Sequence, residues 1–119
     1  MKLLIQNGRV IDPATGLDKV CNIAVAAGRI IAIDREPKDF TPSRVIDAKG
    51  CYVLPGLVDL AARLREPGHE HEGMLESEMG AAVAGGVTSL VCPPDTDPVL
   101  DEPGLVEMLK FRAEKLHQA

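Results

Sequence analysis

Apolar residues follow two different patterns along the chain, and the change comes near residue 55. The first part consists of short apolar runs separated by Gly, Asn and Asp, which is typical of β-strands joined by tight turns. We expect strands at residues 3–5, 9–11, 21–26, 29–33, 44–47 and 51–54. Asn7-Gly8 predicts a tight turn between the first two of these, and Ala27-Gly28 predicts a hairpin. No helical period occurs in this part, so we expect a small antiparallel sheet or sandwich.

After residue 55, short apolar runs alternate with helical periodicity. The runs at 57–60 and 87–92 predict two buried strands. A first helix is expected between them, ending at Gly85-Gly86, and a second from Asp101 as N-cap to the chain end. The apolar stripe of the first helix contains Met74, Leu75, Met79, Ala82 and Val83; that of the second contains Leu105, Leu109, Arg112 and Leu116, and His117 lies in its last turn. The order β-α-β-α predicts parallel strands.

Two βα units are too few to close a sheet or to cover both of its faces. A complete (β/α)₈ barrel takes roughly 250 residues, whereas this chain has 119. We therefore expect the chain to be an N-terminal piece of a larger protein, or to need other chains to complete its sheet.

Charge and cysteine content narrow the class of protein. Thirteen Lys and Arg against 18 Asp and Glu leave a net charge of −5, without a basic run, which argues against nucleic acids and membranes as partners. The three cysteines are odd in number and far apart, at Cys21, Cys51 and Cys92. With no signal peptide and no long apolar stretch, this predicts a reduced, cytoplasmic protein.

The segment DLAARLREPG at residues 59–68 is the first candidate for chemistry. It follows an expected strand, and α/β enzymes place their reactive groups at the carboxyl ends of strands. Alternate residues of a strand project from one face, so Ala61, Arg63 and Arg65 are expected on the same side as Asp59. Histidines at positions 61 and 63 would direct two imidazoles at one metal ion.

Four motifs together resemble the start of dihydroorotase, a pyrimidine-pathway member of the cyclic amidohydrolase superfamily. They are GRVIDPATGLD at 8–18, PGLVDL and LREPG within 55–68, EMGAAVAGGVTS at 78–89 and CPPDTDP at 92–98. The resemblance covers essentially the whole chain but only an N-terminal portion of the family's length. It implies an α/β fold in which residues 1–54 form the N-terminal half of a β-sandwich. Residues 55–119 would then form the first two βα units of a (β/α)₈ barrel, which is incomplete in this chain.

The resemblance also implies where substrate and metal would bind. In active relatives a His-x-His strand binds zinc, and here Ala61 and Arg63 stand at those positions. Alanine has no lone pair, and a protonated arginine repels a divalent cation. Arg65 matches the arginine that grips the substrate carboxylate, while Asp95 replaces a substrate-binding asparagine and would repel an anion. We expect no metal ligand, catalytic residue or cofactor in this chain, and an ion pair between Arg63 and Asp95.

Other polar residues near this segment have simpler interpretations. His69-Glu70-His71 could bind zinc, but we interpret it as a solvated loop because no third ligand is apparent. Arg65 and Glu66 could pair with each other and brace the loop.

Three hypotheses about function follow from these residues and this resemblance. The first is a catalytically inactive dihydroorotase homologue that serves as a structural partner of the aspartate carbamoyltransferase catalytic subunit, as some non-catalytic relatives do. The second is an active zinc-dependent amidohydrolase that cleaves a cyclic amide C–N bond with ligands downstream of residue 119. The third is a truncated piece without a function of its own. An exposed edge at the second barrel strand favours a homo-oligomer.

Overall fold

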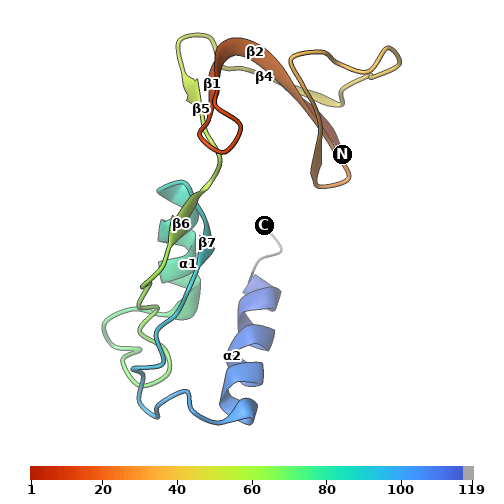
Figure 1. Cartoon of the computed structure of the whole chain (residues 1–119). Coiled ribbons are helices and arrows are strands. Elements are labelled where there is room, and N and C mark those ends of the chain that lie inside the picture. Colours follow the sequence, from red (N-terminus) through yellow and green to blue (C-terminus); the bar gives the residue numbers. More distant parts are fainter. Residues whose placement is uncertain (117–119) are drawn as a thin grey trace. The chain divides into compact units, whose positions relative to one another are not determined.

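The computed structural model describes residues 1–116 of the chain (Figure 1). These residues belong to two compact units, Met1–Pro55 and Gly56–Ala119. The expected place of His117 in a last helical turn lies outside the described residues. Within residues 1–116, neither helix combines the length and the apolar character that a membrane crossing requires.

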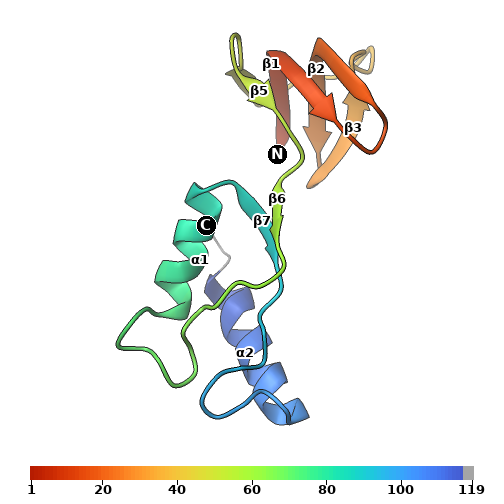
Figure 2. The same ribbon diagram turned by 60° about the vertical axis from the view of Figure 1, so that its left-hand side comes forward.

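The first unit is a five-stranded mixed sheet. Its strands are β1 (Lys2–Asp12), β2 (Leu17–Ala26), β3 (Arg29–Ile33), β4 (Arg44–Asp47) and β5 (Tyr52–Val53). They are arranged in the order β3-β2-β1-β4, with β5 also paired to β1 (Figure 2). The β2–β3 hairpin is confirmed, and its turn places both Ala27 and Gly28 at positive φ, 51° and 71°.

The expectation of a purely antiparallel sheet is wrong, because β4 and β5 run parallel to β1. After β3, residues 34–43 carry the chain back to the start of β1. Ser43 N–H donates to the carbonyl oxygen of Lys2 at 2.8 Å, and Lys2 N–H donates to Ser43 Oγ at 3.1 Å. The strand that follows must therefore run in the same direction as β1.

The predicted turn at Asn7-Gly8 is also wrong, since β1 continues through both residues. Its pairing with β2 shifts between Ile5 and Gly8, and Asn7 adopts a left-handed φ of 64°. This is a β-bulge, which bends a strand without ending it. Gly8 is required there because an added Cβ would lie 2.4 Å from Val53 Cγ2. A single residue in the left-handed conformation serves a bulge as well as a turn, so the local sequence does not separate the two.

The core of this unit is apolar. Val10, Cys21 and Ile23 are buried at its centre, and partly buried apolar residues of β1, β2 and β5 pack against them. Burial of such side chains supplies the main favourable free energy, at about 25 cal/mol per Å² of apolar surface.

The second unit contains β6 (Leu57–Asp59), α1 (Leu75–Ala84), β7 (Val87–Leu90) and α2 (Pro103–Leu116). The strands β6 and β7 pair in parallel, as predicted, and α1 contacts both β7 and α2. Helix α1 ends at Gly85, with Gly86 at a φ of 85°, which confirms the predicted Gly-Gly stop. Helix α2 begins at Pro103 rather than directly after Asp101, and the carbonyl oxygen of Glu102 accepts the N–H groups of Leu105 and Val106.

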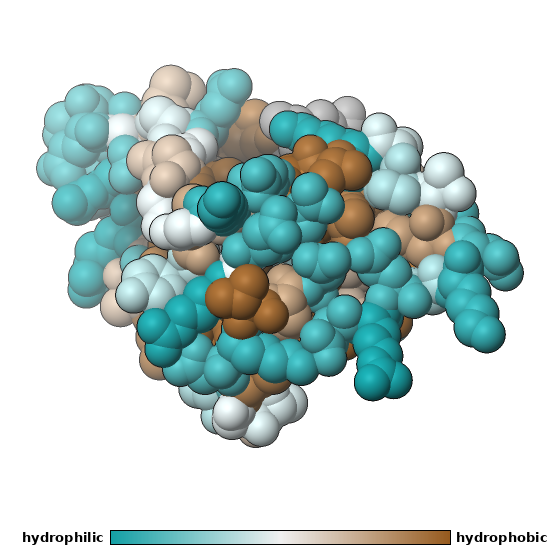
Figure 3. Space-filling view, turned by 90° about the horizontal axis from the view of Figure 1, so that it is seen from above, coloured by the Kyte–Doolittle hydropathy of each residue, from teal (hydrophilic) through white to brown (hydrophobic). Residues whose placement is uncertain are grey.

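The apolar residues of this second unit are less buried than expected. Leu57 and Val58 of β6 are 55% and 61% exposed, so the prediction of a fully buried strand is wrong for this chain. Met74, assigned to the core stripe of α1, is 55% exposed, whereas Leu75 beside it is buried. Among the described residues β6 and β7 pair only with each other, which leaves much of their surface uncovered. Figure 3 shows hydrophobic residues scattered among hydrophilic ones at the surface.

Candidate functional site

The segment after β6 keeps an extended, alternating course beyond the end of the strand. Val91 N–H donates to the Asp59 carbonyl oxygen at 2.8 Å, and Ala62 N–H donates back to the Val91 carbonyl oxygen at 3.0 Å. Leu64 is buried, whereas Ala61 and the arginines at 63 and 65 are exposed. The side chains at positions 61, 63 and 65 are thus exposed together, in agreement with the alternation inferred from the sequence.

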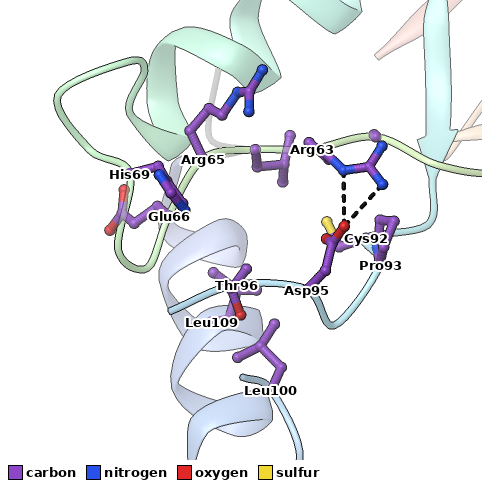
Figure 4. Close-up of a pocket in the computed structure, with 12 residues that line it drawn as sticks. Arg63, Arg65, Glu66, His69, Cys92, Pro93, Asp95, Thr96, Leu100 and Leu109 are labelled. Atoms are coloured by element: carbon purple, nitrogen blue, oxygen red, sulfur yellow. Dashed lines mark hydrogen bonds and ion pairs between the residues drawn. The ribbon is translucent and has the colours of Figure 1, made fainter. Parts of the chain in front are cut away.

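Arg63 and Asp95 form the predicted ion pair, which the structure confirms. Arg63 Nε and Nη2 lie 2.9 and 2.8 Å from the same oxygen, Asp95 Oδ2 (Figure 4). Asp95 comes from the turn after β7, so the pair joins the ends of two neighbouring parallel strands. Both side chains are about half exposed, at 55% and 49%. The pair therefore stays partly hydrated and contributes little to stability.

These residues do not fit a metal ion at the end of β6. Ala61 has no donor atom, and its N–H group donates to Asp59 Oδ1 at 2.9 Å. Arg63 brings a permanent positive charge to the second position and occupies the carboxylate of Asp95. A divalent cation would have to displace an arginine from its counter-ion and then bind beside it. No step of a metal-assisted reaction can be assigned to these side chains.

Arg65 takes no part in the Arg63–Asp95 pair drawn in Figure 4. Its Nη1 lies 3.1 Å from Glu72 Oε2, so the expected bracing pair between Arg65 and Glu66 is wrong. The backbone of Arg65 has a left-handed φ of 64°. A substrate carboxylate at Arg65 would have to replace Glu72 as its partner.

Glu66 is the most buried charged residue among those described, at 2% exposure. Its Oε2 accepts the N–H of Leu75, the first residue of α1, at 3.0 Å, and its Oε1 forms an ion pair with Arg112 of α2. A carboxylate at a helix N-terminus is stabilised by the helix dipole. Glu66 thus ties the loop to both helices, a role that the motif alone did not reveal. Arg112, assigned to an apolar stripe, is its partner instead.

A cavity of about 140 Å³ lies between the segment at 62–69, the turn after β7 and Leu109. Its charged groups are paired with each other or with nearby residues, as described above. Cys92, which also lines it, is the only thiol there, and burial raises its pKa. A thiol with a raised pKa is a poor nucleophile at neutral pH.

The loop after Gly68 brings together three groups that the sequence analysis did not combine. One ligand atom each from His69, His71 and Glu72 lies within 4.8 Å of the others, and all three residues are exposed. The loop is exposed, as expected, but a third group that could bind a metal does lie beside the histidines, namely the carboxylate of Glu72. Glu70 instead accepts the Gly68 N–H at 3.0 Å, and backbone hydrogen bonds lower the pKa of its carboxyl. Spacing identified the histidines, but only the turn of the backbone shows which glutamate faces them.

Comparison with known proteins agrees with the motifs. No model of a protein family matches the chain. A dihydroorotase-like protein of Pseudomonas putida is 51% identical over 115 residues, which cover 97% of this chain and 27% of that protein. A dihydroorotase of Pelobacter propionicus is 45% identical over 115 residues, with the same two coverages.

Among solved structures, L-hydantoinase (dihydropyrimidinase) from Arthrobacter aurescens matches with a TM-score of 0.81 and 28% identity. The match covers 93% of this chain and 24% of the hydantoinase. The expected architecture, the start of a β-sandwich followed by the first barrel units, is confirmed by this likeness. The chain spans about a quarter of the length of the curated relatives it matches.

Proposed function

Because the chain belongs to the dihydroorotase family, of which it matches the N-terminal part, we propose that its protein is a catalytically inactive dihydroorotase-like protein of pyrimidine biosynthesis. In this proposal it acts as a structural partner of the aspartate carbamoyltransferase catalytic subunit. It forms a homo-oligomer and works in the cytoplasm, in keeping with its three free cysteines.

One observation carries the proposed loss of activity. The positions that hold a His-x-His pair in the family motif hold Ala61 and Arg63, and Arg63 is bound to Asp95. Three changed side chains thus act together: one ligand is missing, one is replaced by a cation, and the third change supplies that cation with its counter-ion. Drift at a single position would leave an unpaired charge, whereas this arrangement is electrostatically satisfied.

A scaffolding role is supported by what the chain keeps. Glu66 retains the LREPG loop on both helices although the ligand positions beside it have changed. A protein under selection for assembly needs its folded framework and its surface, but not its ligands.

The test uses the product of the whole gene together with aspartate carbamoyltransferase from the same organism. We expect the two to co-purify, carbamoyltransferase activity or heat stability to rise on mixing, and hydrolysis of dihydroorotate to stay at the buffer rate. Normal carbamoyltransferase behaviour without any association would contradict the scaffolding role.

A second candidate is an active cyclic amidohydrolase, and the 45% identity to a protein named dihydroorotase favours it. It would need metal ligands outside residues 1–119. Turnover of dihydroorotate by the whole gene product, unchanged in Arg63→Ala and abolished by chelators, would establish this candidate. Bound zinc without turnover would not, because zinc can bind elsewhere.

A further inference from the structure

We propose that His69, His71 and Glu72 bind one Zn²⁺ ion, or a divalent ion of similar ligand preference. The site lies on the loop between the LREPG motif and α1. The inference goes beyond the proposed function, because it holds whether the protein assembles with a partner or hydrolyses a substrate.

The geometry of the three groups is close to that of a metal site. His69 Nδ1 lies 3.9 Å and His71 Nε2 lies 3.8 Å from the same oxygen, Glu72 Oε1. A tetrahedral zinc ion with bonds of about 2.0–2.1 Å separates its ligand atoms by roughly 3.3 Å. The two imidazole rings lie 6.0 Å apart and are tilted by 44°. Small side-chain rotations at exposed positions would bring all three atoms into range.

The backbone already holds these residues in a turn. His69 N–H donates to the Arg65 carbonyl oxygen at 2.8 Å, and Glu72 N–H donates to the His69 carbonyl oxygen at 2.9 Å. The buried Glu66 anchors the start of the same loop to α1 and α2. Binding therefore does not have to order a free chain, which would oppose it entropically.

Glu72 is oriented by a second interaction of its carboxylate. Its Oε2 is held by Arg65 at 3.1 Å, which leaves Oε1 directed at the histidines. Carboxylates that ligate metals are commonly held in this way by a neighbouring group. Arg65 also carries a positive charge, which the carboxylate of Glu72 offsets.

The donor set indicates the class of ion. Two imidazole nitrogens and one carboxylate oxygen suit Zn²⁺ and related transition metals, whereas Mg²⁺ prefers oxygen ligands alone. Three protein ligands leave a fourth coordination position for water or for an outside ligand.

The experiment titrates Zn²⁺ into the metal-stripped full chain in competition with a chromogenic chelator. We expect one ion per chain, and no competition from Mg²⁺ at the same concentration. The His69→Gln and His71→Gln variants should each weaken zinc binding by at least about tenfold, and Arg65→Gln by about tenfold through misplacement of Glu72. The matched control Glu70→Gln, one residue from each histidine, should change the affinity less than threefold.

A second readout is the NMR spectrum of the imidazole rings during the titration. Shifts of the His69 and His71 signals, saturating at one equivalent, support the site. The proposal is overturned if zinc does not bind to the unsubstituted chain. It is also overturned if zinc binds the His69→Gln and His71→Gln variants as tightly as the unsubstituted chain. It is also overturned if Glu70→Gln weakens binding as much as they do. All four substituted side chains are exposed, and an unchanged circular dichroism spectrum shows that each variant is folded.

Discussion

The two units of the chain place their residues by different means. In Met1–Pro55 the buried centre is apolar and is formed by Val10, Cys21 and Ile23 on paired strands. In Gly56–Ala119 the buried residues are Leu64, Leu75 and the charged Glu66. Pairing and apolar burial thus build the first unit, whereas a buried carboxylate helps to position the site loop of the second. The two units should therefore respond to different kinds of substitution.

The largest effect is expected from a cavity in the first unit. Ile23→Ala removes a buried side chain and should lower the free energy of unfolding by about 2–5 kcal/mol. Because two units need not unfold together, hydrogen exchange of individual amides is the suitable measurement. Amides of β1 and β2 should exchange faster and those of α1 should not. If amide exchange became faster by the same factor in both units, the two units would unfold together. They would then not differ in their response to this substitution.

Removal of the buried charge should affect the second unit instead. Glu66→Leu leaves the Leu75 N–H without its acceptor, which costs about 1–3 kcal/mol, and also leaves Arg112 unpaired. Faster exchange is expected in α1 and in residues 66–75. Glu76→Gln, in the first turn of the same helix but exposed, is the control and should change little. If Glu66→Leu had no effect, the polar anchor would not be needed.

A glycine-to-alanine substitution should have opposite signs in the two units. At Gly8 the new Cβ would meet Val53 and Ala48, at 2.4 and 3.0 Å, and crowding should destabilise the first unit by about 1–3 kcal/mol. At Gly80, inside α1, the new Cβ would meet no described atom within 4 Å apart from the adjacent residues and the backbone of the helix itself. There the better helix propensity of alanine should stabilise the second unit by about 0.5–1 kcal/mol. Thermal unfolding of both variants measures these stability changes. If both substitutions stabilised the protein, or both destabilised it, this interpretation would be contradicted.

The Arg63–Asp95 pair should contribute little to stability although it occupies the candidate site. A double-mutant cycle with Arg63→Ala and Asp95→Ala should give a coupling of about 0.2–1 kcal/mol, because both side chains are half exposed. Added salt should reduce the coupling. A value several times larger would mean that the pair is a structural element of the second unit like Glu66.

The smallest effect is expected from the surface of the first unit in acid. A hydrogen bond from Arg9 lowers the pKa of Asp18, whose carboxylate lies 2.7 Å from Arg9 Nε. A lowered pKa contributes stability above the ordinary value of 3.8, which is lost as the pH falls through the lowered value. Asp18→Asn should therefore make the unfolding midpoint of the first unit slightly less sensitive to acid below that pH. Asp39→Asn is the control, and an identical acid response of Asp18→Asn and the parent would contradict the expectation.

Much of the secondary structure of the second unit could be predicted from the local sequence pattern. The helical period ending at Gly85-Gly86 and the parallel pairing of β6 with β7 were predicted, because helix stops and crossovers depend on neighbouring residues. The Arg63–Asp95 contact was predicted from two substitutions at the ends of adjacent strands. The bulge at Asn7 was not, since one left-handed residue serves a turn and a bulge alike.

The sequence by itself determined the likeness to the N-terminal part of dihydroorotases, through the motifs at residues 55–68 and 92–98, and the lack of metal-binding side chains at positions 61 and 63. Once a position is matched to a motif, the residue type alone shows whether its side chain can bind a metal ion, and no coordinates are needed. Only the tertiary structure decided that Glu72 faces His69 and His71, and that Glu66 is buried between Leu75 and Arg112. Those contacts depend on the path of a loop and on the packing of two helices. The helix packing joins residues far apart in the chain, such as Glu66 and Arg112. The path of the loop is set by backbone hydrogen bonds such as that from Glu72 N–H to the His69 carbonyl oxygen, which residue types alone do not specify.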